Sequence, residues 1–181
     1  LQQKFGVSST PVRDAINHLY LDGLLDDITN GGARIISFDL TFALEVNEVV
    51  MILTQGATRA AARENRLQEL ASILKQVIEE QKNVRTMEDY IQLDRRFHQA
   101  FFTCGGNEHL DQTYHQYTVL FEMLVRLSQA GGGQRSESMA EHQKIYECCR
   151  KEDLDGMERE IELHYQSAAE WFVQHASAFE A

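Results

Sequence analysis

Apolar residues recur at intervals of three and four along most of this chain, which is the period of an α-helix with one buried face. Glycine clusters interrupt this pattern at residues 31–32, 105–106 and 131–133. The pattern predicts six helices after residue 38, over residues 39–65, 67–82, 87–103, 107–130, 134–151 and 153–175. Because the connections are short, an antiparallel bundle is the arrangement that buries all six apolar stripes.

The same spacing predicts which face of each helix is buried. In the first bundle helix, the residues expected to point inward are Leu44, Val49, Ile52 and Leu53. In the second helix they are Leu70, Leu74, Val77 and Ile78. Residues 39–181 are therefore predicted to form an all-α domain.

The first 38 residues have a different pattern. A helix is predicted over residues 12–21 with Leu19 on its inner face, and Pro11 fits its first turn, where a missing N–H group costs nothing. Strand-like residues 33–36 follow a glycine pair, which indicates a small β-hairpin. This order is typical of a winged helix-turn-helix. The chain is thus predicted to be mainly all-α, with a partial winged helix-turn-helix domain over 1–38 and the six-helix antiparallel bundle over 39–181.

Composition and charge limit the possible classes of protein. Of 181 residues, 17 are Lys or Arg and 28 are Asp or Glu, which gives a net charge of −11. This excludes a uniformly basic nucleic-acid-binding surface but not a local basic element. No apolar run approaches the roughly 20 residues of a membrane span. This predicts a protein without a membrane partner. Because the three cysteines, Cys104, Cys148 and Cys149, form no disulfide framework, we also expect a cytoplasmic protein.

Two parts of the sequence resemble a known family. Residues 1–23, LQQKFGVSSTPVRDAINHLYLDG, resemble the core of the winged helix of GntR-family transcriptional regulators. The remainder is similar to the FCD effector-binding domain of the FadR subfamily, through Asp94–His98, Gly106–Asn107, Glu141–His142 and Asp153–His164. The family's first helix would precede Leu1, so the resemblance implies an N-terminally truncated chain. It also implies a regulator rather than an enzyme, acting on double-stranded operator DNA as a homodimer.

The resemblance implies that four side chains face DNA: Ser8, Ser9, Thr10 and Arg13. On chemistry alone, the hydroxyl groups are equally well explained as helix caps and the arginine as a solvated helix residue. Ser9 replaces an arginine that the family usually has, and Asp26–Asp27 stands where the approach to the wing is usually basic. Because phosphate contacts need positive charge, weak non-specific affinity for DNA is expected.

Four residues in the bundle form a candidate metal site. Asp94 and His98 are four residues apart, so their side chains lie on the same helix face. His142 and His164 fall within the apolar stripes of two other helices. A histidine in such a stripe is more often a hydrogen-bonded core residue than a ligand, but the FCD pattern matches all four positions. Three imidazoles and one carboxylate suit Zn²⁺ or Ni²⁺, with Mn²⁺ as an alternative.

The resemblance further implies a small organic acid as effector, bound through its carboxylate at open positions of the metal and altering operator affinity. Where the family has a cation and an acid in the first bundle helix, this chain has Val50 and Thr54. Arg126 is the candidate effector-binding residue that could replace the missing cation. Arg95 could also replace it, although a solvated surface position is favoured for Arg95.

Two other functions remain open at this stage. A zinc-dependent hydrolase could use an open metal position to activate water, although the chain has no HExxH sequence. A metal- or ligand-binding module that has lost DNA binding is favoured by Ser9 and by the acidic pair Asp26–Asp27.

Overall fold

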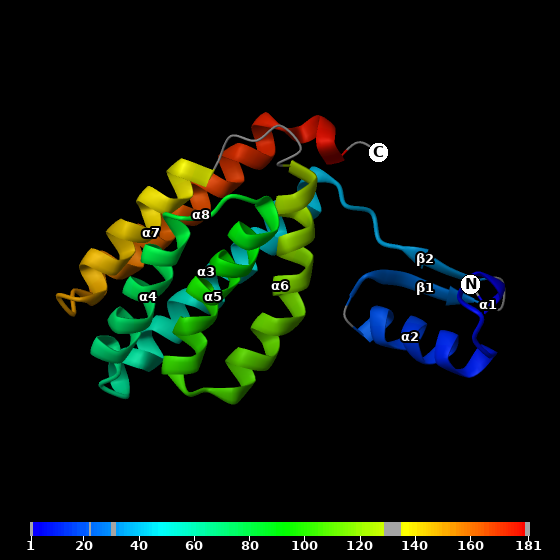
Figure 1. Ribbon diagram of the computed structural model, residues 1–181, viewed down its shortest axis with the longest axis horizontal. Coiled ribbons are helices and arrows are strands. Elements are labelled where there is room, and N and C mark those ends of the chain that lie inside the picture. The colour runs from blue at the N-terminus through cyan, green and yellow to red at the C-terminus, as the bar shows by residue number, and fades with distance from the viewer. Residues whose placement is uncertain (1, 22, 30–31, 129–134, 180–181) are drawn as a thin grey trace. The chain divides into compact units, whose positions relative to one another are not determined.

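The computed structural model describes residues 2–21, 23–29, 32–128 and 135–179. These residues form two compact units, Leu1–Phe38 and Asp39–Ala181 (Figure 1). Residues 129, 130 and 134, which were predicted to belong to bundle helices, lie outside the described residues. No helix in the described part of the chain is both long and apolar enough to cross a membrane.

The second unit is built from the predicted six helices, which confirms the fold class. They are α3 (Leu40–Arg63), α4 (Leu67–Gln81), α5 (Met87–Gly105), α6 (Glu108–Ser128), α7 (Arg135–Cys149) and α8 (Leu154–Gln174), followed by the 3₁₀ helix η2 (Ala176–Phe179). Helix α3 packs against α5, α6 and α8, while α4 packs against α5 and α7 (Figure 1). Helix α7 also packs against α8. The core of the unit therefore lies around α3 and α5.

Side-chain caps explain where several helices begin. The carboxylate of Asp39 accepts a hydrogen bond from the Phe42 amide at 2.8 Å and starts α3. Thr86 caps α5 and Asp153 caps α8 in the same way. Each cap satisfies an amide that has no partner within its helix. Gly106 ends α5 with a φ of 63°, a left-handed conformation that glycine adopts without strain.

The predicted inner face of α3 is only partly correct, because Leu44, Val49 and Leu53 are half-buried. Ile52 is 55% exposed, and the buried face carries small or polar residues instead: Ala43, Val46, Asn47, Val50, Thr54, Ala57, Thr58, Ala60 and Ala61. Small residues allow a close approach between helices. A Cβ atom added to Gly105 of α5 would lie only 3.0 Å from the carbonyl oxygen of Ala57. The inner face of a central helix is thus selected by close packing rather than by the largest apolar side chains.

In the first unit, α1 (Gln2–Phe5) and α2 (Ser9–Leu21) precede a hairpin of β1 (Leu25–Thr29) and β2 (Gly32–Ile35). The strands are antiparallel, with Leu25 opposite Ile35 and a register shift between Leu25 and Asp27. Helix α2 begins at Ser9, three residues before the predicted start. Leu19 is 41% exposed, so its predicted inward position is also wrong, and α2 has no buried residue.

The corrected face of α3 makes a direct prediction. Val50→Ala should lower the free energy of unfolding by about 2 kcal/mol, because it removes two buried methyl groups and leaves a cavity. Ile52→Ala should change it by no more than about 0.5 kcal/mol, because that side chain is exposed. Urea unfolding followed by circular dichroism measures both, and equal losses would contradict the observed orientation of α3.

Candidate metal centre

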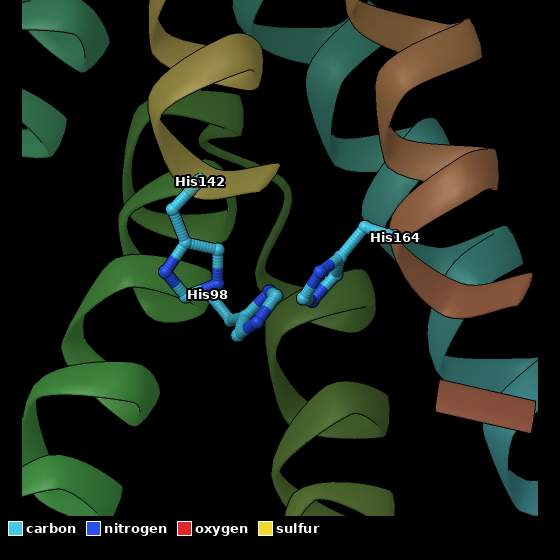
Figure 2. A group of neighbouring side chains, drawn as sticks. All are labelled: His98, His142 and His164. Carbon is cyan, nitrogen blue, oxygen red and sulfur yellow. The ribbon is translucent and has the colours of Figure 1, made fainter. Parts of the chain in front are cut away.

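Three histidines from different helices converge inside the bundle. His98 lies on α5, His142 on α7 and His164 on α8, and their exposed fractions are 5%, 0% and 7%. One ring nitrogen of each lies within 4.8 Å of those of the other two. Figure 2 shows the three rings directed toward one another from their separate helices.

Asp94 lies beside this cluster, one helical turn before His98. Its carboxylate oxygens are 3.9 Å from Nε2 of His98 and 3.6 Å from Nε2 of His142. The structure thus brings together all four residues that the sequence singles out as metal ligands. In the described part of the chain, no other group of His, Cys, Asp or Glu residues forms a candidate metal site.

Each ring has a hydrogen-bond partner at Nδ1, and each partner determines where the ring proton lies. Nδ1 of His142 lies 3.3 Å from Oε1 of Gln81, and Nδ1 of His164 lies 2.8 Å from Oε2 of Glu141. Both oxygens can only accept, so both rings donate from Nδ1. Nδ1 of His98 lies 3.3 Å from the hydroxyl of Tyr165. In a neutral ring with its proton on Nδ1, Nε2 is left with a lone pair.

The unpaired atoms in the cluster test whether a metal ion fits. Nε2 of His98 and Nε2 of His142 are buried and have no hydrogen-bond partner. A buried polar atom without a partner costs free energy, which a coordinated ion would remove. Two or three imidazole nitrogens together with a carboxylate form a donor set typical of Zn²⁺ and similar divalent ions. The residues present therefore fit such an ion.

Burial also sets the protonation states of the cluster. Desolvation lowers the pKa of His98 and of His142 well below the usual range, and the charge of His164 acts in the same direction. Desolvation raises the pKa of Asp94 to about 6, against the opposing effects of His164 and a hydrogen bond with Tyr90. At neutral pH the two imidazoles are neutral and the carboxylate is ionised, which are the forms that bind metals.

Aromatic packing fixes the orientation of His142. Its ring stacks on Phe97 with 3.7 Å between centroids and an interplanar angle of 11°.

A small cavity of about 30 Å³ adjoins the cluster, lined by Tyr90, Asp94, Phe121, Val125, Ser138, His164 and Ala168. Since a water molecule needs about 10–15 Å³ measured in this way, the cavity has room for about two waters. No lysine or arginine is among the residues that line it.

Arg126, the candidate cation for effector binding, lies on the surface of α6. Its guanidinium pairs with Glu88 at 2.9 Å, and its side chain is 44% exposed. Arg95 is paired with Glu122. Neither arginine lines the cavity, so the structure does not bring them together with the histidines. Val50 and Thr54 are both buried.

The predicted DNA-facing residues lie together in the first unit. Ser8, Ser9, Thr10 and Arg13 are exposed, in the residue before α2 and in its first turns. In the hairpin, Nε of Arg34 donates to Oδ1 of Asp26 at 2.8 Å. The positive charge of Arg34 is therefore partly neutralised by the acidic pair that the sequence analysis noted.

The sequence analysis missed the residues that hold the histidines. They are Gln81, Glu141 and Tyr165, and each contacts an imidazole from a different helix. Glu141 directly precedes His142 but bonds to His164. Tyr165 directly follows His164 but bonds to His98. No periodic pattern marks such partners, because they depend on how the helices pack.

The fold and the cluster define a class of protein: a helical bundle with a buried histidine cluster, preceded by the helices and hairpin of a winged helix-turn-helix. Residues 45–167 match the FCD domain. The chain belongs to the FCD-domain family, and its sequence relatives and structural neighbours include HTH-type and GntR-family transcriptional regulators. This matches the resemblance seen in the sequence.

Individual relatives agree with this family. The chain is 27% identical over 173 residues to the HTH-type transcriptional regulator YdhC of Bacillus subtilis (strain 168), covering 94% of this chain and 77% of YdhC. Its fold is similar to that of Lar, which controls expression of the Listeria monocytogenes agr system, with a TM-score of 0.72 and 20% identity over 96% of this chain and 83% of that one. A GntR-family regulator from Pseudomonas syringae pv. tomato gives a TM-score of 0.67 and 20% identity over 98% of this chain and 74% of that one. These proteins are regulators rather than enzymes, which removes the support for the hydrolase alternative.

The raised pKa of Asp94 predicts how the metal-free chain responds to pH. The shift from 3.8 to about 6 means that the folded chain holds this proton more tightly than the unfolded chain. Ionisation therefore costs stability as pH rises between these values, by about 3 kcal/mol once it is complete. In chelator-treated protein, Asp94→Asn should raise the free energy of unfolding by about this amount near pH 8 and hardly at all near pH 4. A pH-independent difference in urea unfolding between the two chains would contradict it.

Proposed function

We propose that this protein is a ligand-responsive, DNA-binding regulator whose helical unit holds one divalent metal ion. The observation that carries the proposal is the cluster of three buried imidazoles, each with Nδ1 occupied by a protein partner. Two of the opposite nitrogens are buried without any partner, beside an acidic side chain. Such a cluster is costly without an ion and favourable with one.

Asp94, His98, His142 and His164 would hold the ion, with Zn²⁺ or Ni²⁺ preferred and Mn²⁺ as an alternative. When bound, the ion supplies a positive charge that attracts an oxygen ligand. Since the four residues come from α5, α7 and α8, they would also cross-link three helices of the bundle.

A small organic acid is the proposed effector, and its carboxylate group would enter the cavity beside Asp94 and His164. Because neither lysine nor arginine lines this cavity, the ion would be the main positive partner of a carboxylate there. Arg126 as an effector contact stays a prediction. To make that contact, the guanidinium of Arg126 would have to break its ion pair with Glu88 and bind the effector instead.

The proposed DNA contacts are Ser8, Ser9, Thr10 and Arg13, whose exposure leaves them free to reach phosphates and base edges. Winged helices usually read paired half-sites, so we propose that a cytoplasmic homodimer binds double-stranded operator DNA. In this scheme, effector binding changes operator affinity by favouring one arrangement of the two units.

A second candidate function is a metal- or ligand-binding module that no longer binds DNA. The Asp26–Arg34 ion pair favours it, because this pair offsets a basic residue of the hairpin. The two candidates share the metal site and differ only in the first unit, so DNA binding separates them.

Metal binding is tested by elemental analysis after mild dialysis. The wild-type chain should retain one divalent ion, and His142→Ala should lose it. His115→Ala is the matched control, because His115 and Asp111 have the same spacing as His98 and Asp94 but lie on the surface, with 3.7 Å between Nε2 and Oδ1. Metal affinity should fall as pH drops below about 6, where Asp94 binds a proton that the metal must displace. A wild-type chain that stays metal-free in zinc and nickel buffers would refute this part of the proposal.

DNA binding is tested by selecting duplexes from a random pool and measuring their affinity by fluorescence anisotropy. Arg13→Ala should lower the affinity for the selected duplex about tenfold, as expected for the loss of one direct contact. Lys75→Ala removes the same charge from an exposed position on α4 and should have little effect. If no duplex is enriched, or if both variants bind equally well, the module without DNA binding is the better description.

A further inference from the structure

Tyr165 lies between the histidine cluster and helix α3, and it is 1% exposed. Its hydroxyl is 3.3 Å from Nδ1 of His98 on α5 and 3.1 Å from Oγ1 of Thr54 on α3. Its backbone carbonyl accepts a hydrogen bond from Nδ2 of Asn47, also on α3, at 2.9 Å. Helix α3 thus contacts this one residue at two points, and one of them leads directly to a candidate metal ligand.

His98, Tyr165 and Thr54 form a chain of hydrogen bonds, and the bond that Thr54 makes to the backbone determines which atom donates in each of the others. Thr54 donates its hydroxyl proton to the carbonyl oxygen of Val50 at 2.8 Å. Its oxygen is therefore free to accept, and the Tyr165 hydroxyl donates to it. The Tyr165 oxygen then accepts from Nδ1–H of His98, because its own proton is already used. This leaves Nε2 of His98 with a lone pair, and that is the atom that has no partner in the described part of the chain.

We propose that Tyr165 and Thr54 are positioning residues that hold His98 in the tautomer able to bind a metal through Nε2. The hydroxyl of Thr54 accepts a hydrogen bond from the Tyr165 hydroxyl. The Tyr165 oxygen therefore accepts from Nδ1–H of His98, which keeps the ring proton on Nδ1. The metal-binding consequence rests on the proposed function, whereas the tautomer itself belongs to the metal-free chain. Partners of ligating histidines commonly act in this way, and losing one typically lowers metal affinity by about 10–100-fold.

The pair of variants at Thr54 separates this role from packing. Thr54→Val keeps the shape of the side chain but removes the acceptor for the Tyr165 hydroxyl. That hydroxyl then donates to Nδ1 of His98, which places the ring proton on Nε2, where it blocks the metal. Thr54→Ser keeps the hydroxyl and should preserve the wild-type tautomer. The Val50 carbonyl keeps its helical hydrogen bond in both variants.

Two further variants test the tyrosine. Tyr165→Phe removes the acceptor for Nδ1–H of His98 and should also weaken metal binding. Tyr117→Phe is the control, because Tyr117 is a half-buried tyrosine of α6 that takes no part in the hydrogen bonds or ring contacts of the three imidazoles described above. It should leave both the tautomer and the metal affinity unchanged.

The experiment has two readouts. Nitrogen-15 NMR of the imidazoles in metal-free protein reports the tautomer of His98, and competition with a chelator reports the affinity for Zn²⁺. We expect an Nδ1–H ring in the wild type and in Thr54→Ser, an Nε2–H ring in Thr54→Val, and a 10–100-fold loss of Zn²⁺ affinity in Thr54→Val and Tyr165→Phe. The thermal midpoint of each metal-free variant shows whether it is folded.

Two outcomes would overturn the inference: an unchanged His98 tautomer in folded Thr54→Val, or Zn²⁺ affinities of Thr54→Val and Thr54→Ser that do not differ. A wild type that binds no Zn²⁺ refutes the metal part of the proposed function and, with it, the metal-binding consequence. The tautomer readout still decides between the directed hydrogen-bond chain and simple packing.

Discussion

A buried imidazole needs hydrogen-bonding or metal partners for both of its nitrogens. In the helical unit three imidazoles converge, and each has a protein partner at Nδ1. The Nδ1 partners come from α4, α7 and α8, while the rings come from α5, α7 and α8. Every one of these hydrogen bonds therefore joins two different helices. Each bond also directs a ring toward the common centre. These three hydrogen bonds thus both join helices of the bundle and assemble the candidate metal site.

Exclusion of water gives this site its chemistry. It lowers the pKa of His98 and His142 and raises that of Asp94, so near neutral pH the imidazoles offer lone pairs and the carboxylate offers a charge. The metal-free site is correspondingly strained, because an ionised carboxylate is held in a poorly solvated place. Binding of a cation would relieve this strain. The same desolvation that destabilises the empty arrangement would favour the occupied one.

The four candidate ligands could be found from the sequence because their signals are local. Asp94 and His98 share a helix face through their spacing, and His142 and His164 interrupt apolar stripes. Gln81, Tyr165 and Thr54 could not be found in this way, because their roles depend on contacts between helices far apart in sequence. The orientation of α3 was missed for a related reason. Its inner face carries alanine and threonine, whose hydropathy is weak, and close packing against α5 and α8 decides which side is buried.

The hydrogen-bond chain from His98 ends on α3, and α3 is the helix that begins directly after the first unit. In the proposed function, a ligand would change operator affinity only by binding more tightly to one arrangement of the protein than to another, and such couplings typically amount to about 1–3 kcal/mol. Leaving one buried hydrogen-bonding group without its partner costs about the same free energy. A rearrangement that makes or breaks the Thr54–Tyr165 contact would therefore be sufficient in size. It would act on α3, whose backbone continues without interruption from residue 38.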